Sequence, residues 1–436
     1  MQSLAKLSEA IIKIVFVPLL AAFPLIALGF YAVDMGYLSD AHAGFLAKSY
    51  LAADRGRLEL VGFYYPPLPL LLILPFHTVK APVLFGSLAL GAVFAYAIME
   101  ALTKRLYLVA LAVLFLALTP PVYQLAMEDF SQAIGLLFLW LAWRLFDHWT
   151  EEKIAAYSFM AGLFFGLAVY SVPMALPMAF LAALAAGPVR KLSRNAWAAA
   201  ALVIIFPALI GALIWAYLAW TFTDDLAFLY QVFRYKSVWY PDLLFLLYAV
   251  VFFLTNRKAL WELAVIGLTL PVSTLFGFGF TRGFALAFTG LFPLVNMQKK
   301  APMLAQAALL VGAVLQFLAY HYAYPLVPKP TNEQLIQREI GKSLAQAPDY
   351  SILTDDLTTY PYIAWSETSR PYLLPADGGY EMALSAPRTF VDYIFTCPDQ
   401  SRLYRLFSYR EPEGFVAAWR YRGCIFYREK DAPPLP

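Results

Sequence analysis

The chain has 436 residues, of which 61% are apolar and 14% charged, whereas about 25% of the residues in an ordinary soluble domain are charged. This composition excludes a water-soluble globular fold. The formal net charge is +3, and the basic residues stand in short clusters between apolar runs, which argues against a nucleic-acid-binding surface. We therefore expect a polytopic α-helical membrane protein.

The predicted transmembrane helices begin with the apolar run at residues 11–31. It is long enough to span a bilayer at about 1.5 Å per residue, and no small-residue cleavage site follows a short core, so we interpret it as a retained signal anchor. Ten further runs bring the expected number of spans to about eleven; they lie at 82–102, 106–123, 130–146, 155–171, 172–186, 197–220, 243–255, 260–276, 284–295 and 302–322.

The orientation follows from the short loops, because an excess of Lys and Arg marks the cytoplasmic side. With the N-terminus inside, most loop cations lie in the cytoplasm, and most loop acids lie outside. We expect a multi-pass protein of the plasma (inner) membrane. This topology requires that residues 66–76 do not cross completely, and their prolines at 66, 67, 69 and 75 favour a re-entrant segment.

The composition changes after residue 322. Pro325, Pro328 and Pro330 form a linker, and the residues after them have ordinary charge density. Strands are expected at 350–354, 391–396, 414–421 and 424–428, with helices at 357–365 and 400–409. We predict a transmembrane domain at 1–324 and a small extracytoplasmic α/β domain at 325–436. Cys397 and Cys424 could pair there or remain two buried thiols.

The first outer loop, residues 33–66, is long for a protein with otherwise short connections, and such loops are usually functional. It contains Asp34 and Asp40-Ala-His42, then an amphipathic run over 43–58, and finally Tyr65-Pro-Pro-Leu. A second motif, TPPVYQLAMEDF at 119–130, ends in Glu128 and Asp129.

The order of these motifs resembles the GT-C superfamily of polyprenyl-phosphate-dependent glycosyltransferases. The similarity is strongest to the branch of protein O-mannosyltransferases and lipid A aminoarabinose transferases, and it extends loosely over the whole chain. It implies an inverting transfer from a polyprenyl-phosphate donor to an acceptor hydroxyl of a glycan, lipid or protein. The implied role in cell-envelope glycan biosynthesis needs no nucleic acid and no nucleotide-sugar site.

Asp40 occupies the position of the carboxylate that deprotonates the acceptor in the resembling family. The family often has Asp-Glu there, whereas this chain has Asp40-Ala41, and Asp34 is a substitute candidate. A carboxylate at a partly dehydrated interface can have its pKa raised towards neutrality, which suits a general base. The alternative is that Asp40 only caps a helix starting at Ala41.

The second acidic pair, Glu128 and Asp129, could bind a divalent cation (Mg²⁺ or Mn²⁺) together with Asp40, because hard cations prefer oxygen ligands. No cofactor is otherwise required. The pair could instead orient the acceptor or simply stand at a helix start.

Outer-loop cations are candidates to bind the leaving phosphate, namely Arg234, Lys236 and Arg282. Their alternative role is snorkelling to lipid headgroups. His42 and Tyr65 are further candidates for substrate binding. The main competing function is a transporter or a lipid-linked glycan flippase or polymerase, although such transporters usually carry ionisable groups at mid-membrane.

Overall fold

The computed structural model describes residues 12–61, 66–152, 154–190, 192–223, 259–295, 302–398 and 402–435. Its contacts divide the chain into two compact units. The first unit comprises Met1–Ala32, Gly62–Leu72 and Pro82–Pro328. The second comprises Val33–Val61, Ile73–Ala81 and Lys329–Pro436. Most of the first outer loop therefore folds in the same unit as the C-terminal residues.

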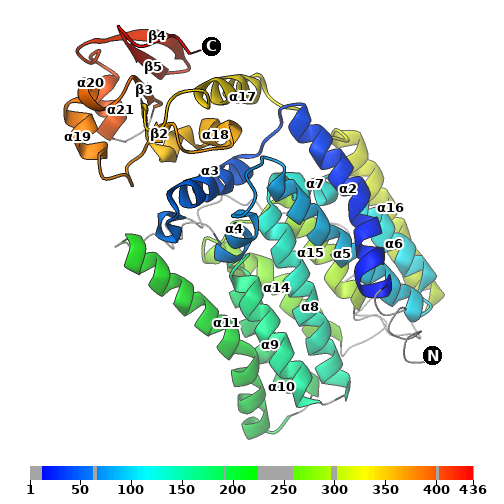
Figure 1. Ribbon diagram of the computed structural model, residues 1–436. Helices are drawn as coiled ribbons and strands as arrows, with labels where there is room; N and C mark the ends of the chain where they lie inside the picture. Colours follow the sequence, from blue (N-terminus) through cyan, green and yellow to red (C-terminus); the bar gives the residue numbers. More distant parts are fainter. Residues whose placement is uncertain are drawn as a thin grey trace, which may run out of the picture. The chain divides into compact units, whose positions relative to one another are not determined.

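Within the described ranges, the first unit consists of helices and their connections (Figure 1). The chain enters through a π-helical turn and continues into a series of mostly apolar α-helices. Their bounds are Ile12–Phe16 (η1), Val17–Asp34 (α2), Pro67–Ile73 (α4), Ala81–Thr103 (α5), Tyr107–Ala117 (α6), Pro120–Glu128 (α7), Phe130–Glu152 (α8), Ala155–Val169 (α9), Ala175–Arg190 (α10), Arg194–Thr223 (α11), Ala259–Leu275 (α14), Arg282–Val295 (α15) and Met303–Ala323 (α16).

Four helices of the described chain are long and apolar enough to cross a membrane: Ile14–Asp34, Ala81–Thr103, Arg194–Phe222 and Met303–Ala323. Shorter apolar helices accompany them in α9, α10, α14 and α15. Helix α11 exposes Leu202, Phe206 and Leu213, an apolar surface of the kind that faces lipid. The protein is thus a multi-pass membrane protein, while a total of about eleven spans remains a prediction. The predicted run at 243–255 lies outside the described residues.

The predicted span at 106–123 is a bent pair of helices. Helix α6 ends at Ala117, α7 begins at Pro120, and the two axes differ by 52°. Pro120 and Pro121 lack the amide hydrogens that a continuous helix would donate, and proline is favoured in the first turn of a new helix. The single straight helix expected from hydropathy is therefore replaced by two.

The proline-rich segment at 66–76 forms only the seven-residue helix α4. At about 1.5 Å per residue it extends roughly 10 Å, a third of the hydrocarbon core, so it cannot cross. The amide of Leu68 donates to the carbonyl of Tyr170, 3.2 Å away.

Small residues bring α9 and α11 into close contact within the first unit (Figure 1). A Cβ on Gly162 would lie 2.5 Å from the carbonyl oxygen of Val203, and one on Gly166 would lie 3.0 Å from that of Pro207. The two glycines stand four residues apart on one helix face. Spacing of this kind lets membrane helices pack backbone to backbone.

The second unit contains a five-stranded sheet in the order β2-β1-β3-β5-β4. Strands β1, β2 and β3 are parallel, whereas β5 is antiparallel to both β3 and β4. The elements are Asp40–Arg55 (α3), Leu58–Val61 (η2), Asn332–Leu344 (α17), Ile352–Leu353 (β1), Asp356–Ser366 (α18), Tyr372–Leu373 (β2), Tyr380–Ser385 (α19), Pro387–Phe390 (α20), Tyr393–Thr396 (β3), Arg402–Phe407 (α21), Phe415–Tyr421 (β4) and Cys424–Glu429 (β5).

Both faces of the central strands of this sheet are buried. Neighbouring residues of β1 show this, because Ile352 belongs to one apolar cluster and Leu353 to another, as the two-residue period of a strand requires. The first cluster also contains Ala47 and Leu51 of α3. The amphipathic helix of the first outer loop therefore contributes to the core of this unit.

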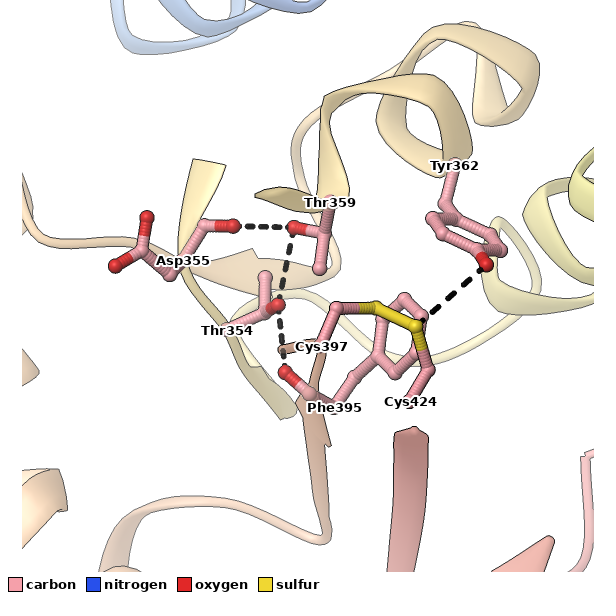
Figure 2. Close-up of a disulfide and its surroundings, with 7 residues drawn as sticks. All are labelled: Thr354, Asp355, Thr359, Tyr362, Phe395, Cys397 and Cys424. Carbon is pink, nitrogen blue, oxygen red and sulfur yellow. Dashed lines mark hydrogen bonds between the residues drawn. A yellow bond between two sulfur atoms is a disulfide. The ribbon is translucent and has the colours of Figure 1, made fainter. Parts of the chain in front are cut away.

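A disulfide joins Cys397, which follows β3, to Cys424 at the start of β5 (Figure 2). The hydroxyl of Tyr362 lies 4.0 Å from the Cys424 sulfur. Beside the bridge, the Thr354 hydroxyl donates to the carbonyl of Phe395 at 2.8 Å. The bridge closes a sequence separation of 27 residues, for which chain entropy gives about 3–4 kcal/mol of stabilisation.

Candidate functional site

Helix α3 begins beside the candidate base. Ser39 is the N-cap, with extended backbone dihedrals, and its side-chain oxygen accepts from the His42 amide at 3.2 Å. Asp40 is the first residue of the helix and its side chain is exposed. The interpretation that Asp40 merely caps the helix is wrong, because Ser39 performs that role. The carboxylate of Asp40 stands at the positive end of the helix.

The surroundings of Asp40 raise the pKa of its carboxyl. The main cause is desolvation by the neighbouring protein, and the negative charge of Glu333 adds to it. Glu333 belongs to the first turn of α17, which has a capping box formed by Thr331 and Gln334. The Gln334 side-chain amide donates to the carbonyl of Leu38 at 2.7 Å, which fixes this turn beside the start of α3.

His42 lies on the inner side of α3 with 1% of its surface exposed. Burial lowers the pKa of its imidazole to about 3. The ring is therefore neutral at physiological pH and closed to solvent, which argues against the predicted direct contact with a substrate.

Asp34, the substitute candidate, has a cationic partner. Its carboxylate lies 2.7 Å from the Lys80 ammonium, and its backbone carbonyl accepts from the Arg338 guanidinium at 3.0 Å. The Asp34 carboxylate is thus engaged by a cation, whereas Asp40 has no ion-pair partner among the residues that the structure describes. The geometry favours Asp40 over Asp34.

The C-terminal half of α3 is tied to the C-terminal residues by charged contacts. Arg55 makes a two-pronged ion pair with Asp377, at 3.0 and 3.1 Å, and also donates to the Tyr372 carbonyl at 2.8 Å. Asp54 accepts from the amide of Ser369 at 2.6 Å.

A third contact joins Lys48 to Asp356. Sequence reasoning missed all of these partners, since no local pattern links residues some three hundred positions apart.

The second acidic pair lies in the first unit, between α7 and α8. Asp129 is 7% exposed, and one of its oxygens accepts from the amides of Ser131 at 3.0 Å and Gln132 at 3.3 Å and from the Ser131 hydroxyl at 2.5 Å. It therefore caps the start of α8, and it is buried instead of standing at a solvated helix start. Glu128 is half-buried next to it.

Arg282 begins α15 close to this turn. The side-chain oxygen of Gln132 accepts from the Thr281 amide at 2.8 Å, which brings the two helix starts together. Arg282 is exposed, donates to the Tyr324 hydroxyl at 3.1 Å and lies 5.1 Å from the ring centre of Tyr320. The Arg282 guanidinium is thus held at the N-terminus of the apolar helix α15.

The 119–130 motif also anchors the linker. The Tyr123 hydroxyl donates to the carbonyl of Leu326, and the Gln124 side-chain amide donates to that of Pro325, both at 2.6 Å. In the sequence these residues carry only the family resemblance, whereas in the structure they hold the chain as it leaves α16.

Three predicted residues, Tyr65, Arg234 and Lys236, lie outside the described residues. Among those that are described, no group of three or more His, Cys, Asp and Glu side chains could hold a metal ion. Asp129 already uses one carboxylate oxygen as a cap. The predicted set of Asp40, Glu128 and Asp129 is divided between the two units, and its divalent cation stays a prediction.

Comparison with solved structures then gives the fold. The crystal structure of ArnT from Cupriavidus metallidurans bound to undecaprenyl phosphate matches with a TM-score of 0.59 and 12% identity, over 95% of this chain and 99% of that one. The chain has the fold of ArnT. The apo form of ArnT matches with a TM-score of 0.55 and 12% identity, over 94% and 97% of the two chains.

No family model matches the sequence, and no curated protein does. The likeness to ArnT confirms the predicted resemblance at the level of the fold.

Proposed function

We propose that this protein is a membrane glycosyltransferase that moves a sugar from a polyprenyl phosphate to an acceptor hydroxyl. The observation that carries the proposal is the fold, which is shared with ArnT over nearly the whole of both chains, together with the undecaprenyl phosphate bound in the ArnT crystal structure. The acceptor is a glycan, a lipid or a protein of the cell envelope.

Asp40 is proposed as the general base. Its carboxylate takes the proton of the acceptor hydroxyl while the acceptor oxygen attacks the anomeric carbon from the face opposite the phosphate. The bond between that carbon and the phosphate oxygen breaks, the anomeric configuration inverts, and polyprenyl phosphate leaves. The raised pKa of Asp40 brings it nearer to the working pH, where a base of this kind contributes about 10²–10⁴ in rate.

The departing phosphate needs positive charge, for which Arg282 is the described candidate. Its two tyrosine neighbours hold the guanidinium at the end of α15 without neutralising it. Arg234 and Lys236 are proposed to assist, and Tyr65 and Glu128 to bind substrate. No step is assigned to a metal ion.

The reaction is proposed to occur on the outer side of the inner membrane, with the N-terminus and the clusters of loop cations in the cytoplasm. The disulfide between Cys397 and Cys424 supports an extracytoplasmic position for residues 325–436, because such bonds persist mainly in oxidising compartments.

The test uses the full chain in lipid nanodiscs. Native mass spectrometry should detect bound undecaprenyl phosphate and weaker binding of undecaprenol, which lacks the phosphate. In a second assay, bacterial envelope membranes supply the acceptor and a radiolabelled hexosyl-phosphoryl-undecaprenol supplies the sugar. Label should move from the lipid to the acceptor only when the protein is present.

Movement of intact labelled lipid between leaflets without cleavage of the sugar–phosphate bond would show a flippase and contradict the proposal.

A further inference from the structure

We propose that a pocket between α17 and the β4–β5 hairpin binds a sugar residue of a glycan acceptor. The cavity has a volume of about 560 Å³ and is lined by, among others, Glu339, Ser343, Trp419, Phe426, Arg428 and Leu435. This size lies within the range of about 300–1,000 Å³ that is typical of sites for small ligands. The acceptor role depends on the proposed transferase function, whereas the binding of sugar does not.

One wall of the pocket is an aromatic platform. Three parallel rings stand side by side on the sheet: Tyr393 and Phe426 have centroids 5.5 Å apart, and Phe426 and Trp419 have centroids 5.7 Å apart. Trp419 is the last of the stack because β4 is the edge strand of the sheet. Its indole stacks on Phe426 and also contacts the ring of Phe395, at 5.5 Å between centroids, and it remains half-buried at the lining of the pocket. An aromatic ring in this position suits the C–H groups on one side of a pyranose ring.

Two opposite charges line the same cavity. Arg428 is half-buried, and its Nε atom is buried without a hydrogen-bond partner among the residues that the structure describes. Glu339 is exposed on α17, and the described residues offer it no ion-pair partner. A buried guanidinium N–H without an acceptor is unfavourable, so a pocket lined by Arg428 favours a ligand that can accept hydrogen bonds.

The combination selects the class of ligand. An anion would pair with Arg428 but not with Glu339, a cation would pair with Glu339 but not with Arg428, and a purely apolar molecule would satisfy neither group. A saccharide meets all three demands, because its hydroxyls donate to the carboxylate and accept from the guanidinium while its ring stacks on the indole. The hydrophobic side chain of Leu435 completes the rim.

The proposal is tested with a panel of trisaccharides: cellotriose, maltotriose, mannotriose and chitotriose. Saturation-transfer NMR and calorimetry on the full chain in nanodiscs should detect binding of at least one. Trp419→Ala should weaken its binding about tenfold or more, as expected of a central aromatic contact.

Glu339→Gln, which alters only an exposed helix position and cannot disrupt the core, should weaken binding as well. The matched control is Tyr409→Ala, since Tyr409 is 92% exposed outside the pocket, and its binding should equal that of the wild type.

The proposal is overturned if no trisaccharide binds, if Glu339→Gln and Trp419→Ala both bind as well as wild type, or if inorganic phosphate binds in place of sugar. Failure of the transferase proposal gives a different result. An Asp40→Asn variant should bind the trisaccharide normally whether or not the wild type transfers sugar, so binding and transfer are judged separately.

Discussion

The contact of Arg55 with Asp377 gives the sharpest prediction about how the candidate base is held in place. The side chains are 5% and 12% exposed, and the guanidinium bridges both carboxylate oxygens. Removing one partner of a buried, hydrogen-bonded ion pair costs about 3–5 kcal/mol, because the other charge stays buried without compensation. Arg55→Ala should therefore loosen α3 from the rest of the second unit.

The expected size of the effect follows from that cost. At about 1.4 kcal/mol per factor of ten, a loss of 3 kcal/mol corresponds to roughly a hundredfold larger population of the open state. Hydrogen–deuterium exchange of peptides covering residues 40–55 should accelerate by about that factor, provided that local opening limits exchange.

Arg57→Ala is the matched control. Arg57 pairs with Glu59 at 2.8 Å, but the two side chains are 54% and 40% exposed, and an exposed pair contributes only about 0–1 kcal/mol. Exchange in the same peptides should then rise by less than about fivefold. Equal protection of α3 in the two variants would refute the assigned role of Arg55.

Three further predictions concern the same unit. Glu333→Gln removes a negative charge that raises the pKa of Asp40, so the acidic limb of the kcat/KM profile should move to lower pH. Ser39→Ala removes the cap of α3 and should cost about 0.5–2 kcal/mol, seen as faster exchange in its first turn. Replacing Cys397 and Cys424 together by Ala should cost about 3–4 kcal/mol, seen as a lower urea midpoint for exchange of the sheet.

Each of these has its own control. Glu381→Gln removes an exposed acid that pairs with Arg402 and should leave the pH profile in place; an identical shift in both variants would contradict the assigned interaction. Ser385→Ala, at the end of α19, should not affect α3. Reducing agent should lower the urea midpoint of the wild type as much as the double substitution does, and an unchanged midpoint would contradict the contribution of the bridge.

Much of the helical architecture is predictable because membrane helices satisfy their hydrogen bonds locally and reveal themselves by composition. The run at 82–102 became α5, and the run at 302–322 became α16. Hydropathy missed the break between α6 and α7, since prolines interrupt a helix without changing its apolar character. The strands expected at 391–396, 414–421 and 424–428 are present as β3, β4 and β5.

Helix α17 was overlooked, although its capping box was visible in the sequence as Thr331-Asn-Glu-Gln334. The cap of α3 was assigned one residue late, because Ser39 and Asp40 are both favoured caps and only the backbone dihedrals distinguish them.

The incorporation of α3 into the core of the second unit could not be predicted. It depends on contacts such as that of Leu51 with the apolar cluster around Tyr372, which are separated by most of the chain. The effect of the Glu333 charge on Asp40 could not be predicted either, because these two residues are also far apart in the sequence. Sequence motifs identified the acid, and the tertiary structure determines its environment.

The most direct test of the central claim compares Asp40→Asn with Asp34→Asn in the transfer of sugar from hexosyl-phosphoryl-undecaprenol. Both variants should insert and fold, because Asp40 makes no cap and Asp34 is exposed. We predict that Asp40→Asn lowers kcat by about 10²–10⁴, while Asp34→Asn stays close to the wild type. Full transfer by the Asp40→Asn variant would contradict the account.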